Sequence, residues 1–264
     1  FTTSRILSPS VILSKERAAK GVSRGVVANS GCANCCVGDQ GLEDAREMAA
    51  LAARHVGVGP DELLVCSTGV IGVELPMALI RQHIGNIEAT SVGGHKFARA
   101  IMTTDTRPKE VAVSVEVDGS TISLGAAAKG VGMVHPNMAT MLAFISTDAS
   151  VERNFLQHAL SEAVNASFNM IDVDGDQSTN DTVLIFANGL AGASHISTGS
   201  SCASAFQEAL TYVCTALAKQ LVSDGEGSQR LIEAGVQGAQ TLDDARAAAR
   251  AIVSSLLVKA MVHG

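Results

Sequence analysis

Thr140 stands where a shaped loop passes into an apolar run, a position that suits an N-terminal nucleophile. Gly132 and Pro136 disfavour regular structure upstream, whereas residues 140–147 are largely apolar and predict a buried strand. A threonine hydroxyl at the start of such a strand is able to attack the carbonyl of the preceding residue, here Ala139. The acyl group then shifts from nitrogen to oxygen and is lost to water, which cuts the chain before the threonine.

Cleavage between Ala139 and Thr140 gives Thr140 a free α-amine. The pKa of an α-amine is about 7.7–8.0, so this group serves as general base for its own hydroxyl near neutral pH. The alternative is an ordinary strand that begins with Thr, because the pattern Pro-Asn-x-x-Thr alone is weak. His135 lies near the scissile bond in sequence and has two interpretations, an assistant in cleavage or a loop histidine in water.

The longer stretch around this threonine is more specific. Residues 129–142 read Lys-Gly-x-Gly-Met-x-x-Pro-Asn-Met-Ala-Thr-Met-Leu, which resembles the self-cleavage segment of the ornithine acetyltransferases, the bifunctional glutamate N-acetyltransferases of arginine biosynthesis. Five further segments resemble the same family in the same order: Asn29 to Gly31, Ser67 to Gly72, Thr103 to Lys109, Asp174 to Asp181, and Asp224 to Gly227. The resemblance thus covers essentially the entire chain.

The resemblance implies a chain truncated at both ends. Residues 1–3 resemble a point inside the family's first strands, and residues 259–264 resemble a segment that more chain follows. No charged and apolar segment of the secretory type opens the sequence. We expect a reducing compartment, either the cytoplasm or, after loss of a transit peptide, the mitochondrial matrix or a plastid.

An acyl-transfer site also needs an oxyanion hole and pockets for its substrates. Ser67-Thr68-Gly69 follows a short apolar strand, where N–H and hydroxyl donors are able to point at one oxygen, but ordinary strand-ending turns have the same composition. The resemblance assigns oxyanion stabilisation to Thr68 and Gly69. It assigns substrate contacts to four residues: Thr103, Lys129, Thr140 and Glu226.

The chemistry of these side chains fits amino-acid substrates. Lys129 offers a compact cation to a carboxylate, and Glu226 is able to pair with the side-chain ammonium of ornithine. Each residue also has a plainer interpretation: a solvated surface lysine, a loop carboxylate in water, and for Thr103 a capping or turn residue.

The activity implied by the resemblance is acetyl transfer from N-acetyl-L-ornithine to L-glutamate by a ping-pong route. Thr140 takes the acetyl group as an ester and then passes it to glutamate, with no cofactor. The sequence leaves open whether acetyl-coenzyme A is a second donor. Two alternatives remain, a self-cleaving peptidase or amidohydrolase that uses water as acceptor, and a non-catalytic relative that binds amino acids.

Metal sites are not favoured. Cys32, Cys35 and Cys36 form a C-x-x-C-C cluster, but no second pair follows at the spacing of a zinc site, so we expect buried, inert thiols. The acidic run from Asp172 to Asp181 resembles a calcium loop but lacks the glycine and the glutamate that such a loop needs at its sixth and twelfth positions. Hydrogen-bonded turns that support the site are the better interpretation of this run.

Composition limits the partners. The chain has 264 residues, a formal charge of −7 and 47% apolar residues, with no continuous apolar run of about 18 residues. This charge argues against nucleic acid and anionic membranes as the main partners and leaves small-molecule substrates. The resemblance implies a heterotetramer of two segments 1–139 (alpha) and two segments 140–264 (beta).

Hydrophobic periodicity places the elements that position these residues. We predict a hairpin turn at Asp118-Gly119 and a turn at residues 29–31 after the first strand. Strands are predicted at residues 25–28, 63–66, 111–117, 121–124, 140–147, 182–186 and 231–236, and helices at 42–56, 76–84, 94–101, 151–164, 206–221 and 242–253. Interleaved strands and helices predict one α+β unit. The resemblance implies layered sheets flanked by helices (αββα-type), similar to N-terminal nucleophile hydrolases with different connectivity.

Overall fold

The computed structural model describes residues 1–134 and 141–264. Its strands are β1 (Gly25–Cys32), β2 (Leu63–Val70), β3 (Lys109–Val117), β4 (Ser120–Lys129), β5 (Leu142–Thr147) and β6 (Thr182–Ala187). Its helices are α1 (Pro9–Ala19), α2 (Gln40–Val56), α3 (Met77–His83), α4 (Gly94–Ala100), α5 (Arg153–Ala166), α6 (Ala203–Ser223), α7 (Leu242–Val253) and α8 (Leu256–His263), with 3-10 turns at Ile84–Asn86 and Phe168–Met170.

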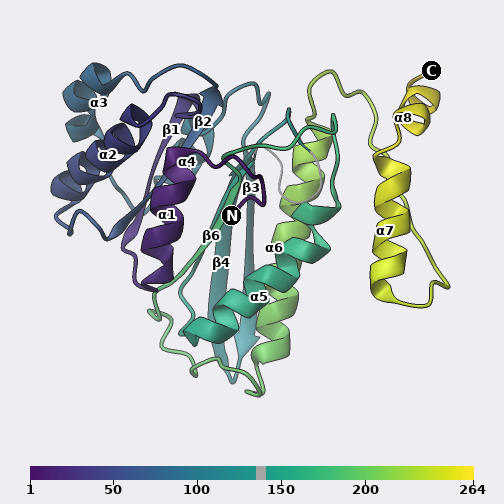
Figure 1. Ribbon diagram of the computed structural model, residues 1–264. Coiled ribbons are helices and arrows are strands. Elements are labelled where there is room, and N and C mark those ends of the chain that lie inside the picture. Colours follow the sequence, from purple (N-terminus) through teal and green to yellow (C-terminus); the bar gives the residue numbers. More distant parts are fainter. Residues whose placement is uncertain (135–140) are drawn as a thin grey trace.

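Two sheets lie between two layers of helices (Figure 1). β1 and β2 pair in parallel, and β3, β4, β5 and β6 form the second sheet in that order. Helices α1 and α2 pack on the first sheet, and α6 packs on β3 and β4 beside α5. This αββα layering confirms the predicted fold class.

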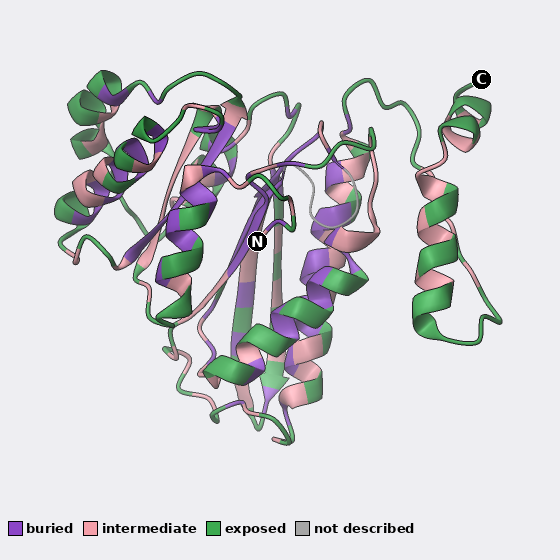
Figure 2. Cartoon of the chain, viewed as in Figure 1, coloured by how far each residue is buried: buried purple, intermediate pink, exposed green. Residues whose placement is uncertain are grey.

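The alternation of side chains along each strand explains the layers, because neighbouring residues face opposite sides of a sheet. On β2, Val65 packs toward α1 and α2, whereas Leu64 joins the apolar layer between the two sheets. On β5, Phe144 joins that middle layer, whereas Ile145 packs in the core beneath α5 and α6. Phe97 of α4 meets Phe144 edge to face, with ring centroids 5.0 Å apart. Figure 2 shows the buried residues along these strands and along the inner faces of the helices.

The connection from β4 to β5 contains the stretch that the sequence singles out. Lys129, the last residue of β4, pairs with Leu142, the first residue of β5. Leu142 in turn pairs with Thr182, the first residue of β6. The two ends of the connection and the start of β6 are therefore held side by side.

Two local predictions are wrong, and one of the helices that form the layers was not predicted. β1 continues through residues 29–31 to Cys32 because these residues pair with β2, so the predicted turn is absent. Residues 231–236 alternate between exposed and half-buried but have no strand beside them in the part that the structure describes, and they are irregular. Helix α1 was not predicted, although Ser8 caps it and Pro9 opens it.

Helices α7 and α8 stand apart from the layers (Figure 1). Neither contains a buried residue, and Figure 2 colours both exposed or intermediate. Lys259 of α8 ties them to the rest of the chain through an ion pair with Asp172. Among the described residues, no helix is long and apolar enough to cross a membrane.

Candidate active site

The C-terminal end of β2 forms one wall of the site. Thr68 is buried there, and Gly69 follows with φ 131°, a backbone conformation that L side chains rarely adopt. A Cβ atom at Gly69 would lie 2.3 Å from the backbone carbon of Gly31 on the neighbouring strand. Close approach of two glycine backbones therefore shapes the predicted oxyanion hole, and only glycine fits at position 69.

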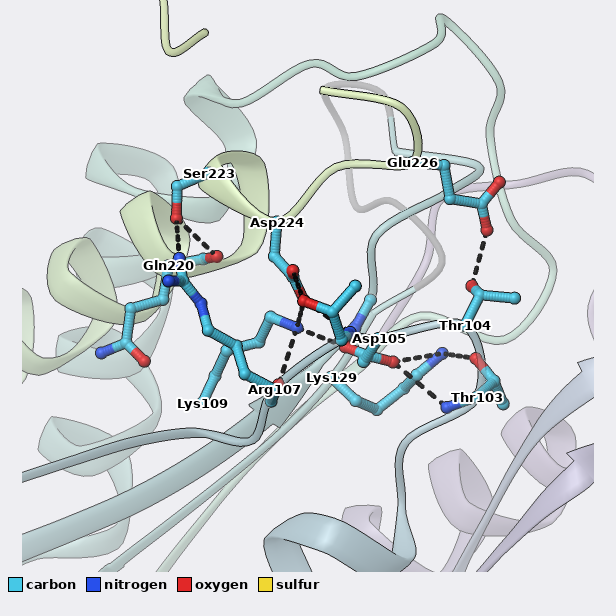
Figure 3. A network of polar contacts seen from close by, with 12 residues as sticks. Thr103, Thr104, Asp105, Arg107, Lys109, Lys129, Gln220, Ser223, Asp224 and Glu226 are labelled. Atoms are coloured by element: carbon cyan, nitrogen blue, oxygen red, sulfur yellow. Dashed lines mark hydrogen bonds and ion pairs between the residues drawn. The ribbon is translucent and has the colours of Figure 1, made fainter. Parts of the chain in front are cut away.

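Lys129 brings two of the predicted residues together. Its ammonium donates a hydrogen bond to Thr68 Oγ1 at 3.0 Å. It also donates to Thr103 Oγ1 at 2.9 Å, and its Nζ lies 4.0 Å from Asp105 Oδ2 (Figure 3). The lysine is only 2% exposed. Burial lowers the pKa of Lys129, and the Asp105 carboxylate offsets part of this change. The lysine is thus part of the buried site and not a solvated surface residue.

A second buried lysine supports the first. Lys109 is fully buried and donates to Asp105 Oδ1 at 2.6 Å and Asp224 Oδ2 at 2.6 Å. Burial acts to raise the pKa of Asp105, but the Gly130 N–H and the Lys109 ammonium outweigh it and hold that pKa below its usual value. Asp105 is therefore a shared anion that fixes the two lysines relative to each other.

Glu226 lies at the exposed side of this network. Its Oε1 accepts a hydrogen bond of 2.6 Å from Thr104 Oγ1, and its backbone N–H donates to Val131 O at 2.8 Å (Figure 3). A Cβ atom at Gly132 would lie 2.7 Å from the Glu226 carboxylate carbon, so the glycine makes room for this side chain. Glu226 thus packs against the loop that leads toward Thr140.

The acidic run holds the described residues on both sides of residues 135–140. The Asp174 carboxylate accepts hydrogen bonds from the backbone N–H groups of Met133 and Val134. Asp181 Oδ1 accepts the Met141 N–H at 3.0 Å. These contacts match the supporting role expected of the run, and Asn180 extends it by donating to the carbonyls of Ala33 at 2.6 Å and Ser67 at 2.9 Å.

Residues 1–264 match the ArgJ family. The chain belongs to this family. An arginine biosynthesis bifunctional protein ArgJ from Symbiobacterium thermophilum is 53% identical over 266 residues, which cover 100% of this chain and 66% of that protein. A glutamate N-acetyltransferase from Methanocaldococcus jannaschii is 47% identical over 270 residues, with the same two coverages of 100% and 66%. The chain thus spans about two thirds of the length of these curated relatives.

A solved structure supports the fold of this ArgJ family chain. The crystal structure of an arginine biosynthesis bifunctional protein argJ from Bacillus halodurans superposes with a TM-score of 0.50 at 39% sequence identity. The match covers 53% of this chain and 74% of that chain.

The structure brings together most of the residues predicted from the sequence. Thr68, Thr103 and Lys129 share direct hydrogen bonds, and Gly69 follows Thr68 on the same strand. Glu226 joins this group indirectly. It accepts a hydrogen bond from Thr104, and the preceding residue, Thr103, accepts one from Lys129. The predicted cleavage site, Ala139–Thr140, lies outside the described residues, as does His135.

Three residues of the network were missed: Asp105, Lys109 and Asp224. All three lie in segments that carry the family resemblance, Thr103 to Lys109 and Asp224 to Gly227. The sequence contained a signal for two of them, because Asp105 and Lys109 are four residues apart within such a segment and this spacing suggests an ion pair. Nothing in the spacing shows that Asp224, more than 100 positions later, completes the pair.

Proposed function

We propose that this ArgJ family protein transfers an acetyl group from N-acetyl-L-ornithine to L-glutamate through an acetyl ester on Thr140. The observation that carries the proposal is the convergence of Thr68, Thr103 and Lys129 from three separate segments. These residues were predicted from the sequence to surround a Thr140 nucleophile. Their cluster adjoins the Lys129–Leu142 register pair, and Leu142 follows Thr140 by two positions in the chain.

Each side chain has a task in this reaction. Thr140 attacks the acetyl carbonyl, and its α-amine, freed by cleavage after Ala139, accepts the hydroxyl proton. Lys129 already donates to Thr68 Oγ1, so the Thr68 hydroxyl proton is free to point at the developing oxyanion. Gly69 supplies a backbone N–H beside it. The α-ammonium returns this proton to the nitrogen of ornithine as the C–N bond breaks, and ornithine leaves. The amine of glutamate then attacks the ester, and its proton passes through the α-amine to the Thr140 oxygen, which restores the hydroxyl.

The polar groups around this centre fit amino-acid substrates. An ammonium has three N–H donors, and Lys129 uses two of them on Thr68 and Thr103, so one remains for a substrate carboxylate. Glu226 is exposed and its Oε1 accepts from Thr104, which leaves Oε2 to pair with the ornithine side-chain ammonium. Water in place of glutamate would make the enzyme a hydrolase, so the acceptor decides between the two activities.

We further propose that cleavage after Ala139 yields segments 1–139 and 140–264, which stay in one fold and pair into a heterotetramer. Strand β4 of the first segment and β5 of the second are hydrogen-bonded from Leu124–Thr147 to Lys129–Leu142. This ladder keeps the two pieces together without a covalent link.

Cleavage is the first test. The full-length protein, its Thr140→Ala variant and a matched Ser146→Ala control are purified, and intact masses and N-terminal sequences are measured. Ser146 is an exposed hydroxyl on β5, six positions after Thr140 in the chain, so this control should be cut like the wild type. Wild type should give a piece that begins at Thr140, and Thr140→Ala should remain whole. A wild type that stays whole would refute the freed-amine mechanism.

Transfer is the second test. With labelled N-acetylornithine, the cut enzyme should form N-acetylglutamate, and double-reciprocal plots at several glutamate concentrations should be parallel. Thr68→Ala should lower kcat by about 10²–10³-fold, the usual effect of removing one oxyanion donor. Labelled free acetate in place of N-acetylglutamate would identify a hydrolase and overturn the transferase assignment.

A further inference from the structure

Two adjacent cysteines lie on a loop beside the oxyanion wall. The Sγ atoms of Cys35 and Cys36 are 3.6 Å apart. Cys35 is only 1% exposed, whereas Cys36 is exposed. This corrects the expectation of uniformly buried, inert thiols, because one member of the pair faces solvent and its neighbour lies directly behind it.

The backbone of this loop is held in an unusual shape. Asn34 and Cys36 have φ angles of 51° and 59°, in the left-handed region that few residues other than glycine adopt. The Asn34 side chain fixes the first of them by donating to Gly41 O at 2.8 Å. The fold therefore maintains the conformation that keeps the two thiols together.

Four hydrogen bonds hold the same loop against the oxyanion wall. The Gly72 N–H donates to Cys35 O at 2.8 Å, and the Ala33 N–H donates to Val70 O at 2.9 Å. Asn180 Nδ2 bridges Ala33 O and Ser67 O at 2.6 and 2.9 Å. Residues 33–35 are thus tied to both ends of the segment that contains Thr68 and Gly69.

We propose that Cys35 and Cys36 form a redox-sensitive dithiol that peroxide closes to a vicinal disulfide, and that this closure lowers the activity of the adjoining site. The exposed Cys36 sulfur reacts first, because access to the oxidant controls which thiol is attacked. Cys35 then resolves the product. The effect on acetyl transfer rests on the function proposed above, whereas disulfide formation does not.

The chemistry balances with peroxide as the only co-reactant. The Cys36 thiol loses its proton and the thiolate attacks one peroxide oxygen; the O–O bond breaks, a sulfenic acid forms, and the departing hydroxide takes up the proton to give one water. The Cys35 thiol then attacks the Cys36 sulfur, an S–S bond forms, the S–O bond breaks, and a second water leaves. The two sulfurs together lose two electrons, and the peroxide is reduced to two waters.

Closure requires the loop to move. The two sulfurs must approach from 3.6 Å to about 2.05 Å. Neighbouring Cα atoms across a trans peptide are about 3.8 Å apart, below the usual disulfide range of about 4.4–6.8 Å. Such a bond is easily reduced, as reversible regulatory disulfides are. Movement of the Cys35 peptide disturbs its hydrogen bond from Gly72 and, through it, the strand end that carries Gly69.

The test oxidises the reduced, full-length, cleaved protein with hydrogen peroxide and follows peptide mass and activity. The peptide that contains both cysteines should lose two hydrogen atoms, and dithiothreitol should restore them. Cys36→Ser should leave Cys35 as a thiol, because the exposed partner is gone. Cys35→Ser should accumulate Cys36 sulfenic acid, which dimedone traps. Cys32→Ser, which removes the third cysteine of the cluster, should behave like the wild type.

Activity is measured in the same samples. The transfer rate should fall several-fold as the disulfide forms and recover with dithiothreitol, and Cys36→Ser should keep its rate in peroxide. A wild type in which Cys36 ends as a sulfenic or sulfinic acid, or pairs with Cys32, overturns the dithiol. A disulfide that forms without any change in rate overturns the switch. Failure of acetyl transfer in the reduced enzyme would instead refute the proposed function, and the mass readout would still decide the dithiol.

Discussion

Replacing Lys109 by methionine should destabilise the protein strongly, because the lysine is the counter-ion of two buried carboxylates. Its Nζ lies 2.6 Å from both Asp105 Oδ1 and Asp224 Oδ2, and the side chains of Lys109 and Asp105 are 0% exposed. Methionine has a similar volume, so the substitution removes the charge without opening a large cavity. Removing one partner of a buried ion pair costs about 3–5 kcal/mol. Asp105 keeps Lys129 at 4.0 Å, whereas Asp224 loses its lysine partner, so we expect Lys109→Met to fall within that range.

The measurement is urea unfolding of full-length wild type and variant at pH 7. The loss of stability is read from the shift of the unfolding midpoint, provided that the slope of the unfolding free energy against urea concentration is unchanged. Lys219→Met is the matched control, because Lys219 pairs with Glu233 at 3.0 Å on the surface, where the two side chains are 55% and 71% exposed. An exposed pair contributes about 0–1 kcal/mol, so the control should change little. The double variant Lys109→Met with Asp224→Asn should recover part of the loss, since one orphaned charge is removed.

Two results would refute this reasoning. A loss below about 1 kcal/mol for Lys109→Met would show that water reaches the carboxylates and that the ion pairs behave as surface pairs. Strict additivity of Lys109→Met and Asp224→Asn would show that the two residues do not interact in the folded protein.

Three further predictions concern single positions. Gly69→Ala should abolish transfer and lower stability, because its Cβ would lie 2.3 Å from the Gly31 backbone; kinetics and thermal unfolding test this. Burial acts to raise the pKa of Asp224, but Lys109 and Thr106 outweigh it and lower that pKa from 3.8 to about 2. Its contribution to stability is therefore present above pH 3.8 and lost as pH falls through about 2, so Asp224→Asn should flatten the acid limb of unfolding curves. Glu226→Gln should raise the KM for N-acetylornithine more than the KM for glutamate in steady-state assays.

The sequence predicted the two central strands because they are apolar on both faces, whereas their arrangement in αββα layers was implied by the family resemblance. Leu63 to Cys66 and residues 142–145 each present apolar side chains to both sides of their sheet, as strands buried on two sides do. The Asp118-Gly119 turn likewise predicted the β3–β4 hairpin. It lies between Val117 and Ser120, which form the last pair of residues between these two strands.

Helix α1 was not predicted because three of its five buried residues, Ser10, Ser14 and Arg17, are polar. Ser14 donates to Val65 O at 2.6 Å, and Arg17 donates to Leu63 O at 2.6 Å, so the helix binds the backbone of β2 through side chains that normally mark a solvent-exposed face. Ser10 lies 2.8 Å from Ser67 through their hydroxyl oxygens. A search for periodic apolar residues misses such a helix. The polar side chains on its inner face form hydrogen bonds with β2, and these contacts are known only once the chain is folded.

The residues of the candidate site could be identified from the sequence, but the contacts between them could not. The family motifs identify Thr68, Thr103 and Lys129 one by one, but the single ammonium that joins them is a property of the folded chain. Position 69 is a similar case. It requires glycine because the backbone of Gly31 on β1 lies so close, and the residues next to it in the sequence do not show this.

The positions of the acidic contacts explain how a cut next to a strand can leave the site intact. Asp174 holds the backbone of Met133 and Val134 before residues 135–140, and Asp181 holds Met141 after them. Asp174 and Asp181 both lie in the C-terminal segment, so after a cut at position 139 one segment still grips the end of the other as well as its own start. β4 and β5 are also paired with each other, from Leu124–Thr147 to Lys129–Leu142. The described residues on both sides of residues 135–140 are therefore held by contacts that do not involve the bond that the proposed chemistry breaks.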